Sequence, residues 1–484
     1  MSKAPSDNQY FGTEKTMKIL FKLAPPVMLA QLIQSLYNIV DSFFIGKFSG
    51  YALTALSVIY PMQLLICAVA VGTGVGVNTV MARFYGQKRT SKAINTAGIG
   101  TVMAVVSWFI FALISFFIIK PYALISAESE IVHEYTITYG RIIGIFSFGI
   151  FLESTWTKIL QSQGDMKTPM IAQIVGALTN IVLDPILIFG MFGIKPMGVA
   201  GAAVATVIGQ SLAAVITGIK GFYKPPKLNI FLPYVKQIYA AGLPNIIMQA
   251  LWTVYILGLN VLLASFSDAS VTVLGIYYKL QSFFFIPLNA LGVCIVPVLS
   301  FNYAINRKDR CKRVFWETVA VSAAFMLLGV AIFVLLPKQS IGIFSNDTEV
   351  LNIGNVAFRI IGASFVPAAL SLTFPILFQA IGKGKESIFI TVLRQVVLLV
   401  PLAWVFSFAG LNYVWLTFPV TEIITCSVSM IFYKKVFCIY QEDVQKYMFP
   451  IVPFLLLKNL ICLLIQYHSH ALLFYYIRFA GYQL

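Results

Sequence analysis

Three polar side chains lie in apolar stretches that are long enough to cross a membrane. Asp41 lies near the end of the stretch from Leu20 to Gly46, and Asn180 and Asp184 lie four residues apart in a second stretch, on one helical face. A carboxylate at the middle of a bilayer costs about 2.5 to 3.5 kcal/mol, and the usual compensation is a bound cation, a proton or a basic partner that faces a wet cavity. These residues therefore indicate a site for a coupling ion.

The composition is that of a protein that crosses a membrane many times. Of the 484 residues, 59% are hydrophobic and 11% are charged, and the mean hydropathy is +0.86; soluble domains are about 25% charged. We therefore expect an all-α, polytopic membrane protein of twelve transmembrane helices. The apolar runs that predict them, each of about 20 residues or more, lie near residues 20–45, 52–82, 93–119, 136–160, 168–193, 198–219, 237–266, 270–303, 314–337, 354–380, 387–408 and 412–433.

The net charge of +16 comes mainly from basic residues in the connections between these runs. Basic residues gather on alternate connections, such as 83–92 and 307–313, whereas the other connections carry acidic residues such as Glu128 and Asp347. The positive-inside rule then places the N-terminus and the end of the twelfth run in the cytoplasm. The start of the chain lacks the apolar core of a cleavable signal peptide. The charge thus indicates topology in the cell membrane rather than binding to nucleic acid.

The chain contains an internal repeat at an offset of 218 residues. Two halves of six spans each insert with the same orientation, so a pseudo-two-fold axis along the membrane normal relates them. We therefore expect substrate to bind between the halves. The matching pairs include Pro26 with Pro244, Gln31 with Gln249, Tyr37 with Tyr255, Gln63 with Gln281, Arg89 with Arg307 and Arg141 with Arg359.

The expected domains follow this repeat. An N-terminal six-helix bundle covers residues 1–220, a basic, proline-containing cytoplasmic linker covers 221–236, and a C-terminal six-helix bundle covers 237–440. The hydrophobic tail, 441–484, is interrupted by Lys458, His468 and His470, and is either one more span or an interfacial segment.

Several segments resemble one family in their order, spacing and duplication. The chain is similar to the multidrug and toxic compound extrusion (MATE) family over about residues 15–440, and closest to its bacterial exporters of cationic drugs. In the first half the resemblance is carried by YNIVDSFFIGKFSGYALTALS (37–57), QGDMKTPM (163–170), NIVLDPILIFG (180–190) and GVAGAAVAT (198–206). In the second half it is carried by VPVLSFNYAINRK (296–308), QAIGKGK (379–385) and RQVVLLVPL (394–402).

This resemblance implies a fold of two bundles that open alternately to either side of the membrane and exchange Na⁺ or H⁺ for an organic substrate. It also implies an ion site in the N-terminal half. The residues that match the family's site are Asp41, Tyr139, Asn180, Asp184 and Thr206.

The depth of these residues in their spans and the chemistry of their side chains support such a site independently of the family resemblance. Asp41 and Asp184 each lie about 16 residues from the cytoplasmic start of their spans, which is about 24 Å at 1.5 Å per residue. Carboxylate, amide and hydroxyl oxygens suit Na⁺, most directly at Asp41, Asn180 and Asp184, while two close carboxylates also suit a proton. At the 218-residue offset these three map onto Leu259, Leu398 and Leu402, which predicts one ion site, in the first half only. The alternative is a structural role, with Lys279 or helix ends as partners.

Four further charges lie within predicted spans: Glu153, Lys279, Arg394 and Glu422. Glu153 and Arg394 both fall in the cytoplasmic half of their spans, so one hypothesis pairs them across the bundles as a gate in the outward-open state. The alternative is that Glu153 faces the central cavity and attracts a cationic substrate. Lys279 and Glu422 are interpreted as cavity-lining or snorkelling groups.

The leading interpretation is a secondary active multidrug exporter, monomeric and without a cofactor, that takes organic cations. A flippase of lipid-linked saccharides is the alternative, because its superfamily shares the fold; it would favour a cationic cavity, whereas Glu153 and Glu422 are acidic. A channel fits the duplicated, proline-broken helices less well than a carrier. An enzyme is disfavoured because no nucleophile motif is present and none of the three histidines lies deep in a predicted span. Six scattered cysteines without a CxxC motif indicate neither a metal site nor a disulfide framework.

Overall fold

The computed structural model describes residues 9–126, 129–345 and 347–437, and in these ranges every regular element is a helix. The expected tail, 441–484, lies outside the described residues. Helices are the natural outcome for apolar segments in lipid, because a helix satisfies its backbone hydrogen bonds within one segment. The described residues up to Met430 form one unit, and those from Ile431 to Phe437 belong to a second.

Ten described helical segments are long and apolar enough to cross a membrane, and two bent pairs bring the number to as many as 12. The first pair is α5 (Glu130–Ile145) with α6 (Phe148–Ser162), bent by 43°. The second is α14 (Thr348–Gly362) with α15 (Phe365–Ala380), bent by 54°. The predicted all-α, polytopic fold is confirmed.

The first half of the chain holds α1 (Tyr10–Thr13), α2 (Thr16–Phe48), α3 (Gly50–Gly86), α4 (Thr90–Ser126), the bent pair α5 and α6, α7 (Lys167–Phe189) and α8 (Val199–Gly221). A short 3₁₀ turn, Leu228–Ile230, then leads into the second half within the expected linker. The second half holds α9 (Phe231–Ala264), α10 (Asp268–Phe284), α11 (Ile286–Ala304), α12 (Lys308–Leu335), α13 (Pro337–Gly342), α14, α15, α16 (Gly384–Val392), the π-helical segment η2 (Leu393–Leu398), α17 (Leu399–Ser407), α18 (Leu411–Val414) and α19 (Thr417–Phe437).

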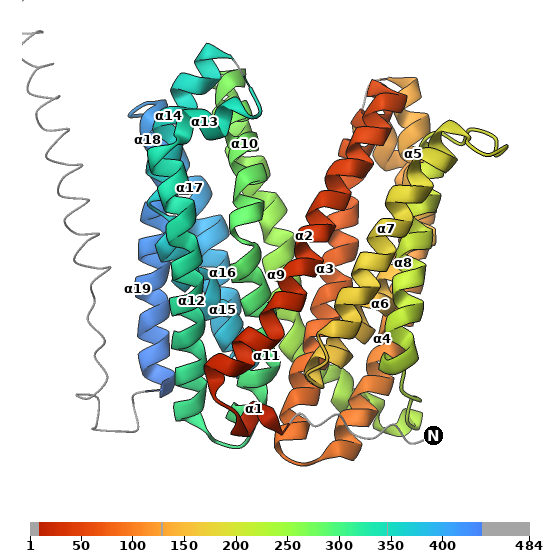
Figure 1. Cartoon of the computed structure of the whole chain (residues 1–484), viewed down its shortest axis with the longest axis vertical. Coiled ribbons are helices and arrows are strands. Elements are labelled where there is room, and N and C mark those ends of the chain that lie inside the picture. Colours follow the sequence, from red (N-terminus) through yellow and green to blue (C-terminus); the bar gives the residue numbers. More distant parts are fainter. Residues whose placement is uncertain (1–8, 127–128, 346, 438–484) are drawn as a thin grey trace, which may run out of the picture. The chain divides into compact units, whose positions relative to one another are not determined.

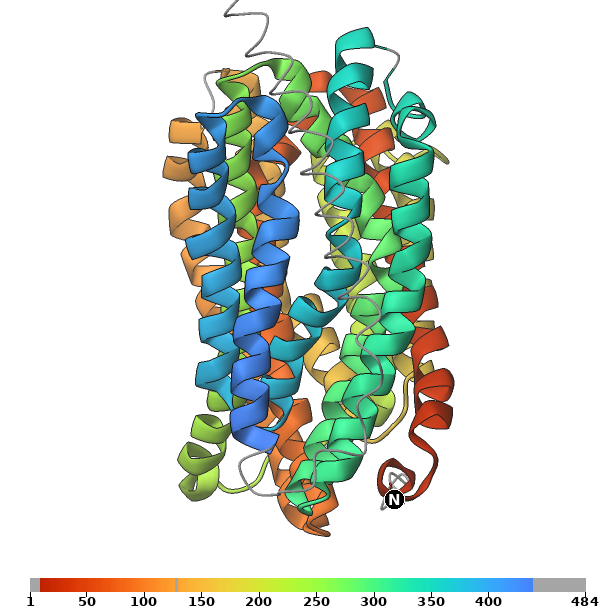
Figure 2. The ribbon, with the colours of Figure 1, turned by 90° about the vertical axis from the view of Figure 1, so that its left-hand side faces the viewer.

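Within Met1–Met430, helices α2 to α8 form one group and helices α9 to α18 form another, and the two groups converge at the end where α1 lies (Figure 1). Figure 2 shows the second group from its outer side, where the helices run alongside one another. Large apolar side chains such as Phe117 and Val261 are 69% and 74% exposed. Such a surface is suited to lipid and unsuited to water.

Glycines allow the two groups to pack backbone against backbone where they converge. A Cβ on Gly76 of α3 would overlap the Ile238 carbonyl of α9, and a Cβ on Gly242 of α9 would overlap the Gly72 carbonyl of α3. Small residues are the usual means of bringing membrane helices this close. We call Gly72, Gly76 and Gly242 the glycine seam.

The short helix α1 and its flanks link both halves at the same end. The Tyr10 hydroxyl donates to the Gly164 carbonyl, 3.3 Å away, in the turn before α7. Phe11 is fully buried, and its carbonyl accepts from Asn302 Nδ2 at 2.9 Å. Arg307 Nη1 donates to the Gly12 carbonyl at 2.6 Å. This segment therefore adds hydrogen bonds to both halves at the end where the glycine seam holds them together.

We predict that Gly76→Ala lowers the free energy of unfolding by about 2 kcal/mol, because the added methyl forces apart two close-packed backbones. Thermal unfolding of the purified protein in detergent measures the effect. The matched control is Gly275→Ala on α10, where a Cβ would meet nothing within 4 Å, and it should leave the unfolding temperature near that of the wild type. Equal unfolding temperatures for the two variants would contradict the tight packing of the seam.

Candidate functional site

Five predicted residues of the first half come together in the structure from four helical segments. Asp41 lies on α2, Tyr139 on α5, Asn180 and Asp184 on α7, and Thr206 on α8. All five side chains are buried, and Asp184 has no exposed surface. The spacing of four residues places Asn180 above Asp184 on the same face of α7.

Asn180 connects the carboxyl group of Asp184 to α8. With its amide nitrogen toward Asp184, Asn180 donates to Asp184 Oδ2 at 2.9 Å. Its amide oxygen then accepts from the backbone nitrogen of Thr206 at 2.9 Å and from Thr206 Oγ1 at 3.2 Å. This orientation gives both ends of the amide a suitable partner, which is how an amide is assigned. Asn180 thereby fixes the position of Asp184.

The carboxyl groups of Asp41 and Asp184 lie within hydrogen-bonding reach of one another. In each residue the Oδ1 oxygen is buried without a partner. None of the ion pairs among the described residues includes either carboxyl group. Two buried carboxylates repel one another unless a proton or a cation lies between them. Among the described residues, this pair therefore has no basic side chain that balances its charge.

Tyr37 and Gln63 also belong to this site, although in the sequence they stand out only as markers of the repeat. The Tyr37 hydroxyl lies within hydrogen-bonding reach of Thr206 and close to both carboxyl groups. Gln63 Nε2 donates to the Tyr139 hydroxyl at 3.5 Å. One signal for Tyr37 is present in the sequence, because it precedes Asp41 by four residues and so shares its helical face.

The resulting set of oxygens can hold a proton or Na⁺. Asp41, Asp184 and Asn180 supply carboxylate and amide oxygens, and Tyr37, Tyr139 and Thr206 supply hydroxyls nearby. Such hard ligands suit cations that prefer oxygen. No group of three or more His, Cys, Asp or Glu side chains that would suit a metal occurs among the described residues.

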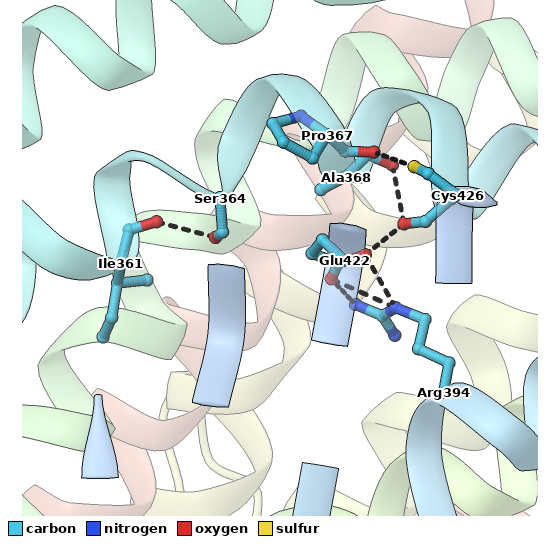
Figure 3. Close-up of polar contacts among 8 residues, drawn as sticks. Ile361, Ser364, Pro367, Ala368, Arg394, Glu422 and Cys426 are labelled. Carbon is cyan, nitrogen blue, oxygen red and sulfur yellow. Dashed lines mark hydrogen bonds and ion pairs between the residues drawn. The ribbon is translucent and has the colours of Figure 1, made fainter. Parts of the chain in front are cut away.

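A second buried polar cluster lies in the second half of the chain (Figure 3). Arg394 donates from Nε to Glu422 Oε1 and Oε2 at 3.1 and 3.2 Å, and from Nη2 to Oε1 at 2.6 Å. The Ser371 hydroxyl donates to Glu422 Oε2. One turn along α19, Cys426 Sγ donates to the Pro367 carbonyl at 3.2 Å. The π-helical segment that carries Arg394 is a local departure from the α-helical ladder, a feature frequent at functional sites.

The predicted pairing of Glu153 with Arg394 is wrong for this structure. Arg394 pairs with Glu422 in its own half, whereas Glu153 accepts from Thr157 Oγ1 at 2.8 Å and lies near Lys158. The depth of a residue in a span fixes its level but not the direction in which the helix turns it, and packing turns Arg394 toward α19.

Lys279 lies apart from the carboxyl pair. It is exposed, with Nζ at 5.8 Å from the centre of the Phe344 ring, so it is not the basic partner that the structural interpretation named beside helix ends.

The family model described as MatE matches residues 26–186 and again residues 244–405. The chain belongs to the MATE family. It is therefore a membrane transporter and not an enzyme. The second match begins 218 residues after the first, which is the offset of the internal repeat.

Similar proteins cover most of the chain of this MATE transporter. The multidrug export protein MepA of Staphylococcus saprophyticus is 25% identical over 419 residues, 84% of this chain and 91% of that protein. The FAD transporter of Shewanella oneidensis is 24% identical over 425 residues, 84% of this chain and 92% of that protein. A solved outward-facing structure of a multidrug resistance MATE family transporter matches with a TM-score of 0.83 at 22% identity, covering 90% of this chain and 99% of that one. The fold is thus the MATE fold.

We predict that Asn180→Leu weakens ion binding about tenfold to a hundredfold, because a hydrogen bond to a charged group contributes about 1.5 to 3 kcal/mol and leucine leaves the Asp184 carboxyl unsupported. The measurement is the Na⁺ or H⁺ concentration that gives half-maximal transport. Asn245→Leu is the matched control, because this amide pairs with Gln249 on α9 at 2.7 Å in the other half. A half-maximal concentration unchanged in Asn180→Leu would remove Asn180 from the site.

Proposed function

We propose that this protein is a cation-coupled multidrug exporter that exchanges Na⁺ or H⁺ for organic cations by alternating access, as a monomer in the cell membrane with its N-terminus in the cytoplasm. The observation that carries the proposal is the buried pair Asp41 and Asp184, which has no basic partner among the described residues. A fixed internal cation would make this pair a structural element. Because no such cation occurs in the described part of the chain, we infer that the pair binds a cation that can exchange.

Ion binding at this pair would change the packing of the first half. Asp41 on α2 and Asp184 on α7 attract one another through a shared proton or Na⁺, and they repel one another when it leaves. The Asn180 link transmits the position of Asp184 to Thr206 on α8. An ion can shift a conformational equilibrium only through a difference in its affinity for the two states. A site whose ligands come from several helices offers such a difference, because movement of the helices changes the distances between the ligands.

A carrier opens first at one side of the membrane and then at the other, to admit and to release its substrate. The glycine seam and the α1 contacts hold the halves together at the end that carries Arg307 and Lys308. The positive-inside rule assigns this end to the cytoplasm. On this interpretation the described arrangement is closed toward the cytoplasm, and export requires the seam to separate.

An organic cation is the substrate that the intramembrane carboxylate Glu153 supports, and one relative is named for the export of drugs. Glu153 is half-buried, accepts from Thr157 and lies near Lys158, and it forms none of the ion pairs found among the described residues. The relative from Staphylococcus saprophyticus is named a multidrug export protein. Aromatic side chains, which make up 14% of the chain, can hold cationic rings by cation–π contacts. The lipid-linked saccharide flippase is less well supported, because Glu422 already neutralises Arg394 and leaves no spare positive charge there for a pyrophosphate.

We predict that Asp41→Asn and Asp184→Asn each abolish export driven by an ion gradient while the protein still inserts into the membrane. Removing a charge from a span should ease insertion. Dye export from membrane vesicles, normalised to protein level, measures the effect. Asp268→Asn, at an exposed carboxylate that begins α10, is the control and should transport normally. Wild-type export by either variant under the same gradient would remove that residue from the coupling mechanism.

We predict that cells expressing the protein resist ethidium-like dyes and quaternary ammonium compounds, and that Glu153→Gln reduces this resistance more than resistance to neutral drugs. A half-buried carboxylate attracts a cation and has no comparable effect on a neutral compound. Growth at graded drug concentrations is the measurement. Resistance confined to anionic compounds, or lipid-linked saccharide flipping without drug resistance, would favour the alternative.

A further inference from the structure

The second polar cluster lies on the repeat equivalents of the helices that build the first. Asp41, Asn180 and Thr206 come from α2, α7 and α8, and the repeat matches these helices with α9, the η2 region and α19. Tyr255 on α9, the counterpart of Tyr37, lies close to Arg394 and Glu422. The 218-residue offset places Arg394 opposite Gly176, one helical turn from the counterpart of Asn180. The two halves therefore carry polar clusters in related places with different contents.

In the second half the positive charge is part of the chain. A guanidinium group keeps its positive charge throughout the physiological pH range, and its planar fork matches a carboxylate. Arg394 makes three contacts with Glu422 at 2.6 to 3.2 Å, and Ser371 contacts Glu422 Oε2 as well. Both oxygens of Glu422 are thus occupied. The two side chains of the pair are 11% and 4% exposed.

The other groups near Glu422 add no competing charge. Tyr255 on α9 and Tyr277 on α10 lie close to the pair, and Cys426 lies one turn away on α19. Tyr278 on α10 lies near Arg394. No second carboxylate faces Glu422 from these elements in the described residues. One glutamate and one arginine therefore balance, and no further cation is required.

We propose that the Arg394 guanidinium is a tethered cation that occupies the second half's counterpart of the ion site and so restricts ion exchange to the first half. Without Arg394, Glu422 becomes a site for a proton or Na⁺. The inference rests on the proposed function for the meaning of the first site, but the state of Glu422 is measured without transport. Arg394 is thus the residue that sets the number of exchangeable ions.

The experiment is infrared spectroscopy of the purified full-length protein, with ¹³C-labelled glutamate to separate Glu422 from Asp41 and Asp184. At neutral pH we expect Arg394→Gln to show one protonated glutamate carboxyl band more than the wild type. Arg394→Lys, which keeps the charge, should show no extra band. The extra band should disappear in the double variant Arg394→Gln/Glu422→Gln and should be weakened by Na⁺ if that ion competes for the carboxylate. Absence of an extra band in folded Arg394→Gln in a buffer without Na⁺ would overturn the proposal.

The double variant keeps the test decisive if Arg394→Gln fails to fold, because it removes both buried charges together. In proteoliposomes it should retain the wild-type number of ions exchanged per substrate, whereas a lower number would show that Glu422 itself exchanges an ion and would also overturn the proposal. Loss of coupling in Asp41→Asn tests the first site separately, so failure of that assignment is distinguishable from failure of this one.

Discussion

A carboxyl group buried among membrane helices needs a compensating positive charge, and this constraint shapes both halves of the protein. In the first half Asp41 and Asp184 face one another without a basic partner among the described residues. In the second half Glu422 has Arg394 at 2.6 Å. On the proposed function, the same physical requirement is met in the first half by an ion that can leave and in the second half by an arginine side chain that cannot. A duplicated fold can in this way assign ion exchange to one half.

The helices around the Asp41 and Asp184 pair connect this site to the packing of the first half. The two carboxyl groups belong to different helices, α2 and α7, and Asn180 connects one of them to α8. On the proposed function, an ion at this site therefore acts on three helices at once. The glycine seam joins the two halves through direct contact between the backbones of α3 and α9, because its residues have no side chains. A backbone-to-backbone contact of this kind is either fully packed or broken, because packed interfaces do not deform continuously. That behaviour suits a carrier that alternates between two states.

Much of this could be predicted from the sequence, because the strongest signals are energetic and periodic. Apolar runs predict the all-helical membrane fold, and the high cost of placing Asp41 and Asp184 in lipid is itself enough to single them out. The residues that sequence reasoning misplaced depend on how each helix turns about its axis. Arg394 lies in the π-helical segment η2, and packing turns its side chain toward Glu422 on α19 rather than toward Glu153. Tyr37 shares the helical face of Asp41, which is a signal in the sequence, whereas Gln63 on α3 carries no such signal and is brought to the site by tertiary packing.

The most direct test of ion-coupled export is uphill transport by the wild-type protein in proteoliposomes in which an imposed Na⁺ or pH gradient is the only energy source. An antiporter should accumulate an ethidium-like dye against the dye's own gradient when one of these two gradients is imposed. The accumulation should collapse when an ionophore dissipates that gradient. Dye movement that only follows the dye's own concentration difference, and is unaffected by either ion gradient, would contradict the account.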